Sequence, residues 1–373
     1  MSSNVLDYIT VRGFKSIASI EKLPLRPINV LIGSNGSGKS NFIGVFSFLH
    51  AVREGRLRKY VIQSGGAEKV LHFGSKTTKQ IEAHLFFGGE DNLQYHLVLS
   101  PTDDDGLYPS TEVASATASR PAKHAFDVPL LPREQGREAG ISGPPRDAVS
   151  GPVQTRLGSW QLYHLHDTSL SSPMRKTAKV NDNRLLRPDG SNLAAFLYFL
   201  QERHQTSYTL IRRTVQRVAP FFDDFRLAPS RLKPDDIMLE WRHQNSDQYF
   251  DSGSFSDGTL RFIALATLFL QPKDFLPSVV LVDEPELGLH PYAIEMLASL
   301  IKQASISTQV IVSTQSSLLL DHFDPEDVLV ANRVDGGTQI IRLEPEQLKE
   351  WLNDYSLGQL WEKGELTGRP LST

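Results

Sequence analysis

Eight residues near the N-terminus, Gly33 to Ser40, have the types and spacing that bind phosphate. They read GSNGSGKS and fit the pattern G-x-x-x-x-G-K-[ST]. The apolar NVLI before them predicts a strand, and the periodic NFIGVFSFLH after them predicts a helix. A plain glycine-rich turn is the alternative, but it does not account for both flanks. The stretch therefore predicts a nucleotide site.

Each residue type in this loop has a physical role. Glycines let the backbone turn its N–H groups inward, and the helix N-terminus adds a positive dipole end. The Lys39 ammonium is expected to reach the terminal phosphates, and the Ser40 hydroxyl to ligate Mg²⁺. The residues predicted to contact the nucleotide are Gly33, Ser34, Asn35, Gly36, Ser37, Gly38, Lys39, Ser40 and Asn41.

A second stretch, SVVLVDEPELGLHP, carries paired carboxylates. The apolar run 279–282 predicts a buried parallel strand, and ligands bind at the C-terminal ends of such strands. Asp283 is expected to hold Mg²⁺ through water, and Glu284 to polarise the attacking water. Taken alone, the pair is equally well explained as a solvated strand end. Together with the phosphate loop it predicts hydrolysis.

A third stretch, SFSDGTLR, runs into an apolar helix. Ser256 can cap that helix, and Gly258 permits a close approach of the backbone. On its own the stretch predicts a capped helix and nothing more. Its place about 25 residues before Asp283, with a helix leading to the carboxylate-bearing strand, gives it a second interpretation.

The set of motifs resembles the ABC-type ATPases, and within them the RecF/SMC-like heads and the ATPase part of the OLD family. The resemblance is carried in order by GFKSI, GSNGSGKSN, EKVLHFGSK, YHLHDTS, DGSNLAAFL, FSDGTLRFIAL, LVDEPELGLHP and VIVSTQS, spread over nearly the whole chain. It implies ATP and Mg²⁺ as cofactors. It also implies that two copies enclose ATP head to tail, with Ser256 and Gly258 contacting the γ-phosphate held by the other copy.

The resemblance implies further roles around the site. ELGLHP occupies the place of the D-loop, so Leu289 and His290 are interface candidates. Gln315 in STQSS stands where these ATPases often carry a switch histidine. An amide can hydrogen-bond a phosphate or water but carries no charge, so we expect slow hydrolysis.

Three more residues are candidates for contacts near the nucleotide. Gln63 and Gln161 are alternatives for the glutamine that completes the Mg²⁺ shell, and Lys76 occupies a position that is often basic in SMC-like heads.

The elements that must position these motifs form an expected α/β fold. The resemblance implies a P-loop NTPase head of the ABC type, with a mostly parallel sheet, an antiparallel β lobe and a helical and β insertion. We expect the nucleotide-binding lobe to comprise residues 1–90 and 250–345, and the insertion 91–249. Residues 101–158, with eight prolines, are expected to be flexible, and 346–373 to form a docking tail that includes Trp351, Tyr355, Leu360 and Trp361. A tail packed on its own core is the alternative.

Composition excludes several classes of protein. There are no cysteines, so disulfides and cysteine zinc sites are excluded, and the formal charge of −4 gives no overall basic signal for nucleic acid. No apolar run approaches the length of a membrane span and no signal pattern is present, so we expect a cytoplasmic protein without a membrane partner.

Two other residue patterns allow competing interpretations. His164, His166 and Asp167 have a spacing that suits a metal, although no third histidine or cysteine accompanies them. Basic residues in two segments predict either a DNA-facing patch or a solvated face. These residues are Arg53, Arg56, Arg58, Lys59, Arg203, Arg212, Arg213 and Arg217.

The resemblance suggests an ATPase subunit of a DNA-repair or antiphage-defence system. OLD-type proteins add a nuclease domain, but the roughly 58 residues after Gln315 are too few for one. We therefore expect a separately encoded effector, a nuclease, besides the homodimer and possible DNA. The alternatives are the nucleotide-binding subunit of a membrane transporter and a non-hydrolysing, ATP-gated scaffold.

Overall fold

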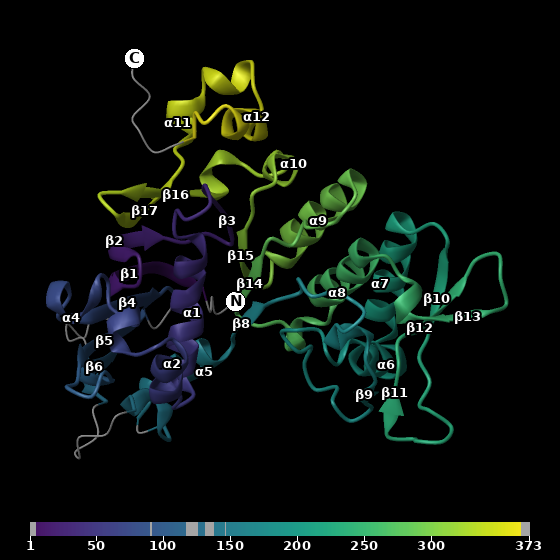
Figure 1. Ribbon diagram of the computed structural model, residues 1–373, viewed down its shortest axis with the longest axis horizontal. Helices are drawn as coiled ribbons and strands as arrows, with labels where there is room; N and C mark the ends of the chain where they lie inside the picture. Colours follow the sequence, from purple (N-terminus) through teal and green to yellow (C-terminus); the bar gives the residue numbers. More distant parts are fainter. Residues whose placement is uncertain (1–4, 90–91, 117–125, 131–137, 146, 367–373) are drawn as a thin grey trace. The chain divides into compact units, whose positions relative to one another are not determined.

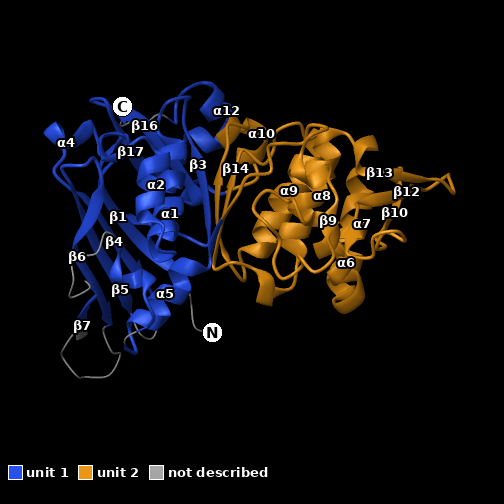
Figure 2. Ribbon diagram, turned by 60° about the horizontal axis from the view of Figure 1, so that its bottom comes forward, with its two compact units in different colours: residues 1–161, 324–355, 359–373 blue, residues 162–323, 356–358 orange. Residues whose placement is uncertain are grey.

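The computed structural model describes residues 5–89, 92–116, 126–130, 138–145 and 147–366 (Figure 1). The chain divides into two compact units, shown in Figure 2. Unit 1 comprises residues 1–161, 324–355 and 359–373, and unit 2 comprises 162–323 and 356–358. These boundaries differ from those of the predicted lobes, because the carboxylate-bearing strand groups with unit 2 and the phosphate loop with unit 1.

Unit 1 contains an antiparallel sheet in the order β2-β1-β4-β5-β6-β7. Its strands are β1 (Leu6–Phe14), β2 (Ile17–Pro24), β4 (Ile81–Phe87), β5 (Leu93–Pro101), β6 (Leu107–Ala116) and β7 (Phe126–Pro129). Along β4 buried residues alternate with partly exposed ones, the pattern of a sheet with one face on the core. β4 and β5 form an antiparallel pair within this sheet, with His84 of β4 opposite His96 of β5.

The phosphate loop lies between β3 (Ile28–Ile32) and α1 (Lys39–Arg53), as predicted. All five residues of β3 are buried, and it pairs in parallel with β16 (Val328–Val334). A hairpin partner, β17 (Gly337–Arg342), runs antiparallel to β16. The C-terminal hairpin therefore lies directly beside the strand that leads into the loop.

Helices and irregular segments complete unit 1. They are α2 (Leu57–Gln63), α3 (Ala67–Val70), α4 (Gly74–Thr77), η1 (Gly140–Ser142), α5 (Ser150–Gly158), η5 (Pro325–Asp327), α11 (Pro345–Leu348), η6 (Trp351–Asn353) and α12 (Leu357–Glu362), whose first two residues group with unit 2. β8 (Trp160–Tyr163) lies where the chain passes between the units.

Much of the interval 101–158, expected to be flexible, has regular structure. Its described residues contribute strand residues to β6 and β7 and the helix α5, while 117–125, 131–137 and 146 lie outside the described residues. The buried Glu112 carboxylate accepts hydrogen bonds from Tyr95 Oη at 2.8 Å and from the backbone N–H groups of Gly140 and Ile141. These contacts attach the segment around Gly140 and Ile141 to strand β6 of the sheet.

Unit 2 is built on the parallel pair β14 (Val279–Asp283) and β15 (Gln309–Ser313), joined by α9 (Pro291–Ala304). The apolar run 279–282 thus forms the buried parallel strand that its sequence predicts. Before β14 comes α8 (Asp257–Leu270), in which every residue from Leu260 to Leu270 is buried. After β15 comes α10 (Ser317–Leu320).

The remainder of unit 2 is helical with small sheets. Two helices, α6 (Leu193–Arg203) and α7 (Gln205–Val218), follow one another with only His204 between them. The strands are β9 (Ala178–Lys179), β10 (Phe222–Arg226), β11 (Asp236–Ile237), β12 (Glu240–His243) and β13 (Tyr249–Asp251), and the short 3-10 turns are η2 (Pro173–Arg175), η3 (Ser252–Ser254) and η4 (Lys273–Phe275). β10, β12 and β13 form an antiparallel sheet.

Candidate nucleotide site

The phosphate loop is shaped by contacts that only glycine permits. Gly38 caps α1 with a left-handed φ of 104°, where a side chain would be strained. A Cβ on Gly38 would lie 1.9 Å from Thr338 Oγ1, so the β17 side chain occupies the space that any larger residue needs. The loop conformation is therefore specified both by glycine and by the C-terminal hairpin.

Lys39 lies inside the loop. Its Nζ donates to the carbonyl of Gly33 at 2.6 Å and to that of Ser34 at 3.3 Å, and the residue is only 7% exposed. Ser40, the next residue of α1, is exposed. A buried ammonium at a helix N-terminus, next to an exposed hydroxyl, suits a polyphosphate and its cation. The residues predicted from the sequence thus fit both ATP and Mg²⁺.

A chain of side-chain hydrogen bonds supports the loop from outside. Thr338 Oγ1 donates to the Ser37 carbonyl at 2.9 Å and bonds Ser16 Oγ at 2.7 Å. Because a hydroxyl has one proton, Ser16 is the donor to Thr338. Ser16 in turn accepts from Asn41 Nδ2 at 2.6 Å. The side chain of Asn41, predicted to bind nucleotide, therefore belongs to the hydrogen-bond chain that supports the loop. The roles of Thr338 and Ser16 in this chain were not predicted from the sequence.

The carboxylates lie at the C-terminal end of β14, as predicted. Asp283 ends the strand opposite Ser313 of β15, and both Asp283 and Glu284 are partly exposed. Glu284 has a left-handed φ of 37°, and its N–H donates to the Ser313 carbonyl at 2.7 Å. Such backbone strain at a non-glycine residue agrees with a functional role for Glu284.

Gln315 is brought onto Glu284. Its Nε2 donates to Glu284 Oε1, so the residue at the predicted switch position contacts the predicted catalytic carboxylate. A neutral amide can orient this carboxylate but cannot supply a charge to it.

A buried carboxylate two residues on, Glu286, was not anticipated from the sequence. It is 8% exposed, and its Oε1 accepts from Thr314 Oγ1 at 2.6 Å. Burial raises the pKa of Glu286, and the hydrogen bond from Thr314 opposes that rise. The only signal in the sequence was a carboxylate between two hydrophobic positions, Pro285 and Leu287.

The SFSDGTLR stretch forms the start of α8. Ser256 caps the helix as predicted, because its Oγ accepts from the Thr259 N–H at 3.1 Å. Gly258 packs on the turn after β14, since a Cβ there would lie 2.2 Å from the Gly288 carbonyl oxygen. The nearly buried Arg175 side chain bonds the carbonyls of Ser252 and Phe255 and the Asp257 carboxylate, which fixes the loop before the helix.

The other predicted residues fall into both units. Leu289 is partly exposed and His290 is exposed, so both are accessible for an interface. Gln63 ends α2, Gln161 lies in β8 and Lys76 lies in α4. Gln63 and Gln161 both stay candidates for the Mg²⁺ shell.

The candidate metal residues do not form a cluster of ligands. The rings of His164 and His166 are 6.5 Å apart, and no group of three possible ligands lies together among the described residues. Burial lowers the pKa of His164, the neighbouring His166 lowers it further, and Asp283 opposes both.

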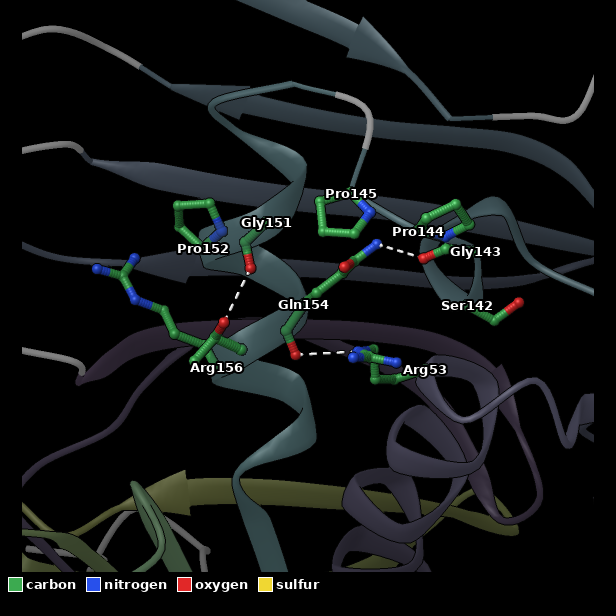
Figure 3. Close-up of a pocket in the computed structure, with 10 residues that line it drawn as sticks. Arg53, Ser142, Gly143, Pro144, Pro145, Gly151, Pro152, Gln154 and Arg156 are labelled. Atoms are coloured by element: carbon green, nitrogen blue, oxygen red, sulfur yellow. Dashed lines mark hydrogen bonds between the residues drawn. The ribbon is translucent and has the colours of Figure 1, made fainter. Parts of the chain in front are cut away.

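The basic residues divide between the units. Arg53 Nε donates to the Gln154 carbonyl at 3.1 Å beside a hollow of about 870 Å³ (Figure 3). In unit 2, Arg212 pairs with Asp224 at 2.9 Å, while Arg203, Arg213 and Arg217 are exposed. Arg53 and Arg212 thus have structural roles, and the exposed arginines of α6 and α7 remain as candidates for DNA contact.

The C-terminal tail is partly a core element. Leu360 is fully buried, so it is not part of an exposed docking surface. Trp351 and Tyr355 are partly exposed with rings 6.2 Å apart, and Lys363 Nζ lies 3.4 Å from the Tyr355 ring centroid. The aromatic surface is therefore smaller than the sequence indicated.

No helix in the described part of the chain combines the length and the apolar character needed to span a bilayer.

Comparisons with known proteins identify a matching family and solved structures of similar fold. The model of a family described as "AAA domain, putative AbiEii toxin, Type IV TA system" matches residues 28–321. A solved SmcHead bound to the C-winged helix domain of ScpA is similar with a TM-score of 0.56 and 16% identity, over 91% of this chain and 98% of that chain. No curated protein matches the sequence.

A second solved structure gives the same result. It is a Smc head domain with an extended coiled coil, bound to the C-terminal domain of ScpA derived from Pyrococcus furiosus. It has a TM-score of 0.54 and 14% identity, over 94% of this chain and 98% of that chain. At these identities the similarity establishes the fold, which is the α/β fold of the ABC-type ATPase heads of SMC proteins.

Proposed function

The chain belongs to the family described as AAA domain, putative AbiEii toxin, Type IV TA system, and from that premise we propose that it binds and slowly hydrolyses ATP with Mg²⁺. The observation that carries the proposal is the strand-loop-helix with Lys39 buried inside the loop. Backbone N–H groups and an ammonium at a helix N-terminus are the chemistry that binds a triphosphate.

The remaining site residues have separate tasks in this proposal. Lys39 holds the terminal phosphates, while Ser40 and Asp283 hold Mg²⁺, which neutralises charge on the phosphates when bound. Glu284 accepts a proton from the attacking water. Gln315 holds one oxygen of Glu284, which leaves the other free to face that water. Since Gln315 cannot become cationic, it stabilises the transition state less than a protonated histidine would, and turnover is slow.

ATP completes a head-to-tail homodimer in this proposal. Each phosphate loop meets the Ser256 and Gly258 segment of the other copy, so ATP binding closes the dimer and hydrolysis opens it. Support comes from Ser256, which caps α8 at an exposed position, and from the exposed His290.

The cellular role we propose is the ATPase subunit of an antiphage-defence or DNA-repair system with a separately encoded effector, such as a nuclease. The family description names a putative toxin of a type IV toxin-antitoxin system, which favours the defence role. The similar SMC heads are bound to a separate protein, ScpA, which supports a protein partner. Membership of the OLD family and direct DNA binding stay predictions.

Nucleotide binding is the first test. Isothermal titration with ATP and Mg²⁺ should show binding to the wild-type chain and none to Lys39→Ala, with both unfolding at a similar temperature. Equal binding by the two proteins would contradict the proposed site.

ATPase assays with and without DNA then test the arginines of α6 and α7. Unchanged rates with every form of DNA, and no binding, would exclude DNA as the activator.

A further inference from the structure

The buried carboxylate of Glu286 has no place in the ATPase chemistry described above. It belongs to the turn between β14 and α9, two residues beyond Glu284. Burying a carboxylate is costly unless hydrogen bonds or charges compensate for it. Its position and its partners therefore need a physical explanation.

Its partners lie in the segment Ser313–Ser316, here called the switch segment. Glu286 Oε1 accepts from Thr314 Oγ1 at 2.6 Å and from the Gln315 N–H at 3.2 Å. Thr314 is fully buried, and its Oγ1 also accepts from the Ser316 N–H at 3.0 Å. Glu286 Oε1 thus holds Thr314 and the Gln315 N–H directly, and it holds the Ser316 N–H indirectly through Thr314.

The switch segment has a second attachment to the turn after β14. The Glu284 N–H bonds the Ser313 carbonyl, and the Gln315 side chain bonds the Glu284 carboxylate. Gln315 therefore contacts one glutamate through its side chain and the other through its backbone. If its backbone moves, its amide no longer reaches Glu284 in the same orientation.

The side chain of Arg261 in α8 lies against the turn that carries Glu286, because a Cβ on Gly288 would lie 3.2 Å from its Nη1. Arg261 is 6% exposed and donates to the carbonyls of Leu165 and His166 at 3.0 and 2.8 Å. Burial lowers the pKa of Arg261, and the carboxylates of Asp257 and Glu286 oppose that shift. The helix that begins at Ser256 therefore packs on the turn that carries Glu286.

We propose that Glu286 is a positioning residue, which fixes the switch segment so that the Gln315 amide orients Glu284 for attack of water on ATP. The assignment rests on the proposed ATPase function and deepens it. Glu286 does not contact the reacting atoms in this account. It acts through Thr314 and the Gln315 backbone, so its loss should change turnover and not nucleotide affinity.

The first experiment needs no nucleotide. Amide hydrogen exchange is measured at Gln315 in the wild-type chain, Glu286→Ala, Glu286→Gln and Thr314→Ser. The Gln315 amide should exchange faster in Glu286→Ala, because its acceptor is lost. Glu286→Gln keeps an acceptor oxygen, and Thr314→Ser keeps the hydroxyl, so both should retain protection. Wild-type protection in Glu286→Ala would overturn the assignment.

The second experiment measures kcat and ATP affinity separately in the same proteins and in Thr314→Val. Glu286→Ala and Thr314→Val should each lose about 10- to 100-fold in kcat, because misplaced groups cost that much in rate. ATP affinity should stay within about twofold, since the phosphate loop is untouched. Glu286→Gln and Thr314→Ser should stay within roughly threefold of the wild-type kcat.

The outcomes separate this assignment from the ATPase proposal. Normal turnover in Glu286→Ala would overturn the role of Glu286 alone. The same conclusion would follow if kcat fell only in proportion to ATP affinity and thermal stability in both Glu286→Ala and Thr314→Val. A wild-type chain that binds no ATP would overturn the proposed function, and with it the role of Glu286. Thr314→Val provides the same test from the opposite partner if Glu286→Ala does not fold.

Discussion

Replacing Thr338 by valine should weaken ATP binding without touching any residue of the phosphate loop itself. Thr338 is 4% exposed, and its Oγ1 both donates to the Ser37 carbonyl and accepts from Ser16. Valine has nearly the same shape but no hydroxyl. The Ser37 carbonyl would then lose a donor in a buried environment, and the partly buried Ser16 hydroxyl would lose its acceptor.

The size of the effect follows from those two hydrogen bonds. Leaving a buried polar group without a partner costs about 1–3 kcal/mol. Part of this cost destabilises the ATP-binding conformation of the phosphate loop, and that part weakens ATP binding. About 1.4 kcal/mol corresponds to a tenfold change in affinity. We therefore expect Thr338→Val to bind ATP on the order of tenfold more weakly than wild type.

Isothermal titration with ATP and Mg²⁺ measures the loss of ATP affinity, and thermal unfolding measures the loss of overall stability. Thr338→Ser is the matched control, because it keeps the hydroxyl and removes only a methyl group. It should bind ATP nearly as wild type does. Wild-type affinity in Thr338→Val, or equal losses in Thr338→Val and Thr338→Ser, would refute the role of the hydroxyl.

Two further substitutions test the other motifs. Gly258→Ala places a Cβ 2.2 Å from the Gly288 carbonyl oxygen, so urea denaturation should show a loss of about 1–3 kcal/mol, and unchanged stability would contradict the packing of α8 on that turn. Glu284→Gln removes the carboxylate that accepts the proton, so kcat should fall by about 100-fold or more while ATP affinity is kept. A Glu284→Gln protein that turns over normally would show that Glu284 is not the base.

The fold was largely predictable because its motifs coincide with strong local patterns. The buried run of β3 and the periodic helix α1 frame the phosphate loop, and β14 and β15 are short apolar strands on either side of α9. Ser256 was identified as a helix cap from its type alone, because capping is a local interaction.

The parts that could not be predicted depend on contacts between distant residues. Thr338 bonds Ser37 across 301 positions of sequence, and no local pattern marks such a pair. Glu286 stands between Pro285 and Leu287 in the sequence, and only the fold brings Thr314, which follows β15, to its carboxylate. Leu360 was included in an exposed aromatic surface because burial on other elements does not show in a short tail sequence.

The central claim is that ATP joins two copies of this chain through the Ser256 segment. The decisive measurement is the mass of the protein in solution with ATP and Mg²⁺, by light scattering, in the slowly hydrolysing Glu284→Gln background. Ser256→Asp keeps a capping oxygen for α8 but puts a negative charge against the triphosphate. We expect an ATP-dependent dimer for Glu284→Gln and a monomer that still binds ATP when Ser256→Asp is added. A double variant that dimerises on ATP as well as Glu284→Gln does would contradict it.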